Sequence, residues 1–244
     1  LFALAWSCGP KPAEHSVTET VVEEVLVPEN SLTEEEKTDG WMLLFDGVNT
    51  DGWRAFNGDS FPSDGWTVED GALKALGKGG DIGGDIVFAP VEFEQFEMEW
   101  TWKIASGGNS GVLYHVVEDP KYDAPYETGP EYQMIDQLGF AEPLEKWQSI
   151  GADYAMTEPN YEGAVKPAGE WNTSKIIFSE AGSSYYLNGQ KTVEFVPYSE
   201  EWTKARNSGK WNDYPDYAIS KTGLISLQDH GAETWFKNIK IKKL

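Results

Sequence analysis

The sequence predicts an all-β protein in which two antiparallel sheets pack face to face as a sandwich or jelly roll. Its 244 residues include 11 Trp, 11 Tyr and 11 Phe, and aromatic side chains are enriched in strands. Twenty-five Gly and 13 Pro interrupt the chain often, as expected of many short strands joined by turns. With 40% hydrophobic residues, the chain can bury a core as one domain, since all-β sandwiches commonly reach this length.

One long segment, residues 93–104, alternates between large apolar and polar side chains. Phe96, Met98, Trp100 and Trp102 fall on one face, and charged side chains and a threonine fall on the other. A period of two over this length predicts a strand with one face in the core.

Two dipeptides predict β-hairpins. Asp70-Gly71 and Asn188-Gly189 each separate two strand-like runs, and both pairs are favoured in two-residue hairpin turns. Residues 137–169 show no clear period, and we expect them to form a long excursion over one face, the kind of loop that often serves a function. Further strands are expected at residues 41–45, 111–117, 132–136, 174–178, 185–187, 192–196, 223–227 and 234–241.

The N-terminal residues predict export. Residues 1–8 read LFALAWSC, an apolar run that ends in a small residue and Cys8, and they resemble the end of a bacterial lipoprotein signal. Cys8 would then carry a lipid that holds the protein in the periplasm or at the outer-membrane surface. Nothing downstream reaches the roughly 18 apolar residues of a membrane span. An ordinary tail or buried cysteine is the alternative.

A tether is expected between this anchor and the compact domain. Residues 9–39 are acidic and poor in large apolar side chains, a composition typical of linkers. Near their end, Thr33 and Glu36 have the spacing of a capping box, which predicts a short helix. The jelly-roll domain is expected to span residues 40–244.

The charge and cysteine content exclude several classes of function. The formal net charge is −22, and such a field repels nucleic-acid phosphates and disfavours anionic substrates. A neutral substrate such as a sugar fits this background. Cys8 is the single cysteine, so an intrachain disulfide and a cysteine-based zinc site are excluded.

Three polar strand segments are candidates for chemistry. Residues 107–115 read GGNSGVLYH, residues 129–137 read GPEYQMIDQ, and residues 224–231 read LISLQDHG. In the first segment, strand alternation places His115 on the face of Leu113, opposite Tyr114.

The other two segments also have a polar face. Glu131, Gln133 and Ile135 share a face, and Gln228 shares a face with His230. Histidine suits proton transfer near neutral pH, although two structural, hydrogen-bonded histidines are the alternative.

Other signatures of catalysis are missing from the sequence. It contains no G-x-S-x-G elbow, no phosphate-binding glycine loop with Lys-Ser or Lys-Thr, and no H-E-x-x-H helix. Carboxylates such as Asp119 and Asp123 leave a calcium site open. A divalent metal, either calcium or a transition metal, therefore stays an alternative.

Several sequence blocks carry a resemblance to a known family. In order they are GNSGVLYH, GPEYQMIDQ, GEWNTSKI, YYLNGQK and GLISLQDHG, the last followed by WFKNIKI. Together they resemble the DUF1080 family of 3-keto-disaccharide hydrolases, from about Gly40 to the C-terminus. The resemblance implies a concanavalin- or laminin-G-like jelly roll and an exported bacterial enzyme that acts on glycosides already oxidised to a ketone at C3.

The implied reaction starts at the acidic C2 proton beside that ketone. A base removes the proton, the C1 substituent leaves, and water then adds, so the net result is hydrolysis. Such a site needs a base, an electrophile for the C3 oxygen and an acid for the leaving oxygen.

The resemblance implies a set of site residues. His115, Glu131 and His230 would be the titrating groups, with His115 or Glu131 as the base and His230 as acid, electrophile or metal ligand. Substrate-binding residues would be Gln133, Gln228, Trp171 and Asn109. By alternation, Asp136 points to the opposite face and is not expected to take part.

Two other functions fit the same sequence. One is a non-catalytic carbohydrate-binding jelly roll, and the other is a calcium-stabilised module of a surface glycan-uptake complex. Convergence of His115, Glu131 and His230 in one pocket would favour the enzyme. A flat face lined by tryptophans would favour a binding module.

Overall fold

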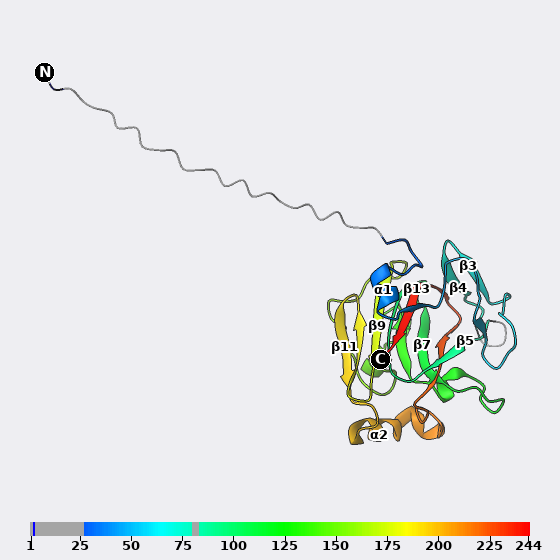
Figure 1. Ribbon diagram of the computed structural model, residues 1–244. Coiled ribbons are helices and arrows are strands. Elements are labelled where there is room, and N and C mark those ends of the chain that lie inside the picture. The colour runs from blue at the N-terminus through cyan, green and yellow to red at the C-terminus, as the bar shows by residue number, and fades with distance from the viewer. Residues whose placement is uncertain (1, 3–26, 80–82) are drawn as a thin grey trace.

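A computed structural model describes residue 2, residues 27–79 and residues 83–244. Within this part of the chain, two antiparallel sheets pack face to face, which confirms the predicted fold class (Figure 1). The eight-stranded sheet has the order β11-β10-β9-β6-β13-β4-β3, with β1 beside β13. Its strands are β1 (Met42–Leu43), β3 (Trp66–Glu69), β4 (Ala72–Leu76), β6 (Phe96–Ile104), β9 (Asn172–Phe178), β10 (Ser183–Leu187), β11 (Gln190–Phe195) and β13 (Glu233–Lys243).

The five-stranded sheet has the order β2-β5-β12-β7-β8. Its strands are β2 (Trp53–Ala55), β5 (Ile86–Phe93), β7 (Asn109–Val116), β8 (Glu131–Ile135) and β12 (Gly223–Leu227). The helices α1 and α2 lie at opposite ends of the sandwich (Figure 1). The helical segments are α1 (Glu34–Thr38), α2 (Glu200–Arg206) and the 3₁₀ turns η1 (Pro125–Glu127), η2 (Lys146–Gln148) and η3 (Gly209–Asp213).

The strongest local predictions are confirmed. Asp70-Gly71 joins β3 to β4, and Asn188-Gly189 joins β10 to β11. Asp70 and Asn188 both have a φ of 49°, the left-handed conformation that such hairpin turns require. Along β6, buried side chains alternate with partly exposed ones over the whole strand. The core between the sheets is aromatic, and its largest fully buried side chains include Trp66, Trp100, Trp102, Tyr114, Tyr132, Tyr185 and Phe236.

The predicted long excursion is present between β8 and β9, and η2 is the helical turn described within it. Part of it runs along the outer edge of β8. The Gln133 amide donates to the Ala152 carbonyl over 3.0 Å, and the Gly151 amide donates to the Gln133 carbonyl over 2.9 Å. These bonds occupy backbone groups that an edge strand would otherwise expose, and they anchor the excursion beside Glu131.

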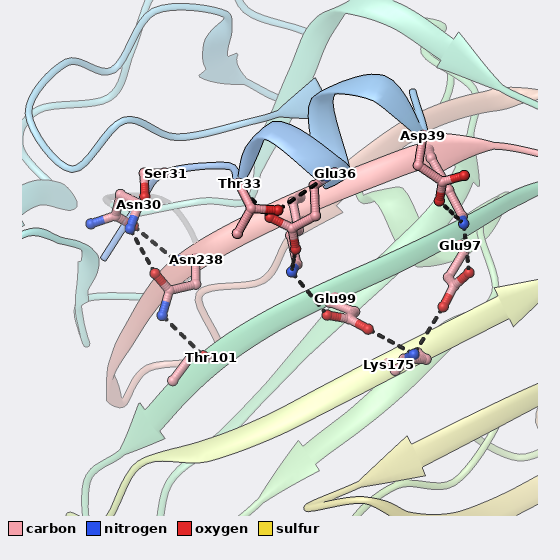
Figure 2. A network of polar contacts seen from close by, with 12 residues as sticks. Asn30, Ser31, Thr33, Glu36, Asp39, Glu97, Glu99, Thr101, Lys175 and Asn238 are labelled. Carbon is pink, nitrogen blue, oxygen red and sulfur yellow. Dashed lines mark hydrogen bonds and ion pairs between the residues drawn. The ribbon is translucent and has the colours of Figure 1, made fainter. Parts of the chain in front are cut away.

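Residues 27–39 lie against β13 instead of forming the end of a free tether (Figure 2). Asn30 and Asn238 exchange two bonds, in which each backbone amide donates to the other's side-chain oxygen over 2.7 and 2.8 Å. Lys242 binds Asp39 over 2.6 Å. The predicted capping box is confirmed, since Thr33 and Glu36 bond reciprocally at the start of α1. These residues therefore belong to the folded domain.

Apart from residue 2, the proposed leader with Cys8 and most of the proposed tether lie outside the described residues. In the parts that are described, no helix combines the length and apolarity needed to cross a bilayer. Lipid anchoring at Cys8 stays a prediction.

Asn30→Ala should lower the free energy of unfolding by about 3 kcal/mol. The change removes the side-chain bonds to the Asn238 amide and the Gly71 carbonyl, worth about 1 kcal/mol each. It also places alanine at a φ of 52°, which costs roughly 1 kcal/mol more. Urea denaturation measures the change. Asn30→Gly is the control and should lose only about 2 kcal/mol, because glycine tolerates this φ. Unchanged stability in both variants would contradict a structural role for the segment.

Candidate active site

A row of polar residues crosses the outer face of the five-stranded sheet. Gly111 of β7 pairs with Gln133 of β8, and the Gln228 amide donates to the Gly111 carbonyl over 3.0 Å. In the next row, Leu113 pairs with Glu131. Tyr132, between the two polar residues of β8, belongs to the core. Glu131, Gln133 and Gln228 therefore share the face that points away from the core, as predicted from alternation for the β8 pair.

Gly111 lets the Glu131 side chain lie across β7. A Cβ atom at Gly111 would stand 2.3 Å from Oε1 of Glu131 and 2.8 Å from its Cγ. Any larger residue would displace the carboxyl group. Steric space for the Glu131 side chain thus explains why position 111 in the GNSGVLYH block is glycine, which the alternation pattern did not reveal.

Glu131 is buried without a polar partner. Only 4% of the residue is exposed, and no hydrogen bond to its carboxyl group occurs within the described residues. Burial raises the pKa of Glu131 to about 8, with the nearby Lys210 charge opposing the rise and the Asp85 charge adding to it. A carboxyl with this pKa can exchange a proton near neutral pH.

Three amide oxygens on the same face are buried with no hydrogen-bond partner among the described residues. They are Oδ1 of Asn109, Oε1 of Gln133 and Oε1 of Gln228. Asn109 precedes Gly111 by two residues on β7 and faces the same side. Buried polar atoms are nearly always satisfied in folded proteins, so a group of orphan acceptors around one carboxyl indicates a place for a hydroxylated ligand.

Lys210 is a site residue that the sequence did not indicate. It lies in η3, and its ammonium stands 4.8 Å from the ring centre of Tyr126, 4.6 Å from that of Tyr154 and 4.8 Å from that of Trp211. Burial lowers the pKa of Lys210, and the charge of Glu131 opposes that shift. No sequence motif surrounds Lys210. Only long-range packing brings it near Glu131, so the sequence could not indicate its role.

Asp85 is a second carboxyl that the sequence reading missed. It directly precedes β5, and Oδ1 accepts from the Asp229 amide over 2.9 Å. Burial raises the pKa of Asp85 to about 7, while that hydrogen bond opposes the rise and the Asp229 charge supports it. The sequence around Asp85 is rich in glycine and suggests a flexible loop, so no functional role was expected there.

The chain is similar in sequence to a known protein family over most of its length. The 3-keto-alpha-glucoside-1,2-lyase-like domain matches residues 40–242. The chain belongs to this family. It is 32% identical over 232 residues to a 3-keto-disaccharide hydrolase of Bacteroides thetaiotaomicron, covering 84% of this chain and 79% of the relative. The predicted class, a glycoside-cleaving enzyme, is confirmed.

Two crystal structures from Parabacteroides distasonis, both provisionally described as glycosyl hydrolases, share the fold. The first is 46% identical, has a TM-score of 0.82, and covers 89% of this chain and 100% of its own. The second is 26% identical, has a TM-score of 0.66, and covers 84% of this chain and 99% of its own. The family and fold therefore agree over nearly the whole domain.

His115 lies on the core side of the sheet, so the alternation predicted through it is wrong. Leu224 pairs with Val116 and Ser226 pairs with Leu113, which leaves Tyr114 and His115 together opposite one residue of β12. This is a β-bulge, and His115 adopts a φ of 54° within it. The imidazole is thereby turned to the side of Tyr114, away from Leu113.

The surroundings of His115 are those of a structural histidine. Its ring centre lies 4.7 Å from that of Phe178 and 6.0 Å from that of Phe96, and Nε2 lies 2.8 Å from the Glu94 carbonyl. Burial lowers the pKa of His115 to about 4, and the contact with Glu94 opposes the shift only in part. His115 and Glu131 therefore lie on opposite faces of the five-stranded sheet.

Trp171 lies apart from Glu131, and His230 lies beyond the last residue of β12. His230 follows the end of β12 and is exposed, so its proposed role as acid or electrophile stays a prediction. Trp171 lies on the other sheet, where the ammonium groups of Lys237 and Lys103 stand 4.1 and 4.9 Å from its ring centre. Its place within the GEWNTSKI block could not show on which sheet it would lie.

The proposed divalent metal has no ligand set in the described residues. No three His, Cys, Asp or Glu side chains there lie close enough together to hold one ion. Asp119, proposed as a calcium ligand, accepts a bond from the Lys121 amide within its own turn. We therefore derive no step that passes through a metal.

His115 should make the fold sensitive to acid. The folded state lowers its pKa from 6.5 to about 4, so the unfolded chain takes up a proton first as the pH falls. The contribution of His115 to stability is complete above pH 6.5 and decreases from there toward pH 4, by up to about 3 kcal/mol. Urea titrations of the native protein and His115→Asn across this range measure the effect. Equal pH dependence in the two proteins would contradict it.

Proposed function

We propose that this protein cleaves glycosides that carry a ketone at C3 of the sugar, by elimination and subsequent hydration. The observation that carries the proposal is the buried, unpaired Glu131 carboxyl amid the orphan oxygens of Asn109, Gln133 and Gln228. The family and the 3-keto-disaccharide hydrolase relative support this substrate class.

Glu131 is the proposed base. Its carboxylate takes the C2 proton, which the neighbouring ketone makes acidic, and the electron pair spreads onto the C3 oxygen as an enediolate. The C1–O bond then breaks, and the leaving oxygen takes up a proton. The product is a C1=C2 alkene. Water adds its hydroxyl to C1 and a proton to C2, so the sum of the steps is hydrolysis.

The surroundings of Glu131 suit this role. General-base catalysis is most effective when the pKa of the base lies near the working pH, and burial raises the pKa of Glu131 to about 8. An ordinary exposed glutamate would be a much weaker base. Because no protein hydrogen bond among the described residues holds the carboxylate, its lone pairs are free to meet the C2 proton.

Lys210 is the proposed electrostatic partner of the enediolate. Its ammonium is held against the rings of Tyr126, Tyr154 and Trp211 and interacts with the charge of Glu131. When Glu131 takes the proton, its negative charge moves to the C3 oxygen. A fixed cation in a site of low polarity stabilises such a developing oxyanion strongly.

The three orphan amide oxygens would accept hydrogen bonds from sugar hydroxyls. This arrangement fits a neutral sugar. Asp85 lies on the same face and also has a raised pKa, so a conventional glycosidase with two acting carboxyls is the competing function. The two differ in substrate, because a conventional glycosidase cleaves the parent glycoside without a ketone.

Glu131→Gln should reduce kcat/KM for a 3-keto-glucoside by about 10²- to 10⁴-fold, the usual contribution of a general base. In the native protein, kcat/KM should rise with pH up to about 8, since Glu131 acts in its ionised form. Release of aglycone measures both effects. Glu92→Gln, at an exposed position of β5, is the matched control and should keep full activity. Activity retained in Glu131→Gln would sink its role as the base.

The elimination route should introduce one solvent deuterium at C2 of the released sugar when the reaction runs in D₂O. Direct displacement at C1 never breaks the C2–H bond and would leave this position protonated. Mass spectrometry of the product distinguishes the two routes, with enzyme-free substrate as the control for spontaneous enolisation. Cleavage of the parent glucoside, without deuterium uptake, would support the conventional glycosidase instead.

A further inference from the structure

A groove opens on the outer face of the eight-stranded sheet, on the opposite side of the sandwich from Glu131. It encloses about 690 Å³, within the range of roughly 300–1,000 Å³ typical of small-molecule sites. Residues 27–36 form one wall, and the outer faces of β6, β9 and β13 form the floor. We call this hollow the outer groove. Its lining includes Glu36, Glu99, Thr101, Thr173, Lys175, Tyr186, Asn238 and Lys240.

The wall of the outer groove is fixed to the sheet along its length (Figure 2). Asn30 is bonded to Asn238, whose side-chain amide also donates to the Thr101 hydroxyl over 3.3 Å. In α1, Glu36 binds Lys240 of β13. The groove is therefore preformed, and a ligand would not have to order a loose segment on binding.

The carboxylates that line the outer groove are all paired with ammonium groups. Lys175 lies 2.8 Å from Glu97 and 2.7 Å from Glu99, and Lys240 lies between Glu99 and Glu36. Burial pushes the pKa of Glu99 upward, but these lysines hold it below its ordinary value. The pairs stay ionised and cancel each other, so the groove presents many donors and acceptors without a strong net charge.

The uncharged lining suits a hydroxylated ligand. Thr173 is exposed on the floor, beside its strand partner Thr101. Tyr186 of β10 adds a half-buried aromatic ring. Aromatic rings offer apolar platforms for the faces of sugar rings, while the hydroxyl and amide groups can bond sugar hydroxyls.

We propose that the outer groove binds a neutral linear oligosaccharide as a second glycan site, separate from the catalytic face. The ligand is unoxidised, because nothing in the groove resembles the buried base and lysine that a ketone would require. With a total charge of −22, the protein disfavours an anionic glycan. The proposal rests on membership of a glycoside-cleaving family and on the groove, and it is independent of the role of Glu131.

Isothermal titration calorimetry with maltotetraose, cellotetraose and laminaritetraose tests the second site on the full chain. At least one should bind, and Glu131→Gln should bind it equally well. Thr173→Tyr fills the floor from an exposed position and should weaken binding about tenfold or more, which corresponds to about 1.4 kcal/mol. Thr67→Tyr, on β3 of the same sheet but outside the groove, is the matched control and should leave binding unchanged.

Three outcomes would overturn the second site. They are no binding of any tetrasaccharide, unchanged binding in Thr173→Tyr, and loss of binding in Glu131→Gln. Thr173→Tyr should also keep kcat/KM for a 3-keto-glucoside within about twofold, and a parallel loss would assign the groove to the catalytic site. If the native protein binds a tetrasaccharide but leaves the 3-keto-glucoside intact, the proposed reaction fails while the second site stands.

Discussion

Burial of an unpaired carboxyl on the outer face of a sheet is the constraint on which the candidate site depends. An isolated carboxylate removed from water is strongly disfavoured, so Glu131 responds with a raised pKa. Three parts of the chain maintain its burial. Gly111 leaves room for the side chain to lie across β7, the excursion after β8 covers the sheet edge, and η3 brings Lys210 with its aromatic neighbours.

The two outer faces of the sandwich differ in whether their polar side chains have partners. On the eight-stranded sheet, Lys175 and Lys240 each contact two carboxylates, so charges are paired and the surface is stable as it stands. On the five-stranded sheet, Gln133 and Gln228 keep buried oxygens without partners. A fully hydrogen-bonded network adds rigidity, whereas buried acceptors without partners can accept hydrogen bonds from a ligand. The shared aromatic core separates the two faces and lets them differ.

Local rules predicted most of the strands, the two hairpins and the polar face of β8, because each depends on neighbours in sequence. No strand was expected where β2 and β5 lie. Asp70-Gly71 and Asn188-Gly189 formed the expected turns, and Glu131 fell on the outer face. The prediction for His115 was wrong, since one bulge shifts the alternation and turns the imidazole into the core. Lys210 could not be found from sequence, because only the packing of η3 places it near Glu131. In each case the missing information was a tertiary contact or a single irregular residue.

The ionisation that the proposed chemistry needs is the one that the fold resists. Asp153 is a second buried carboxyl, which accepts a bond from the Tyr185 hydroxyl over 3.4 Å. The folded-state pKa values of Glu131 and Asp153 both rise to about 8, chiefly through burial, so their contribution to stability at low pH is lost as the pH climbs toward 8. The charge of Glu131 also disfavours ionisation of Asp153, because it raises the pKa of Asp153 further. The active form of the site is thus its less stable form. A bound sugar that donates to the carboxylate and to the neighbouring amide oxygens would reverse this balance, since it supplies the partners that the folded chain withholds.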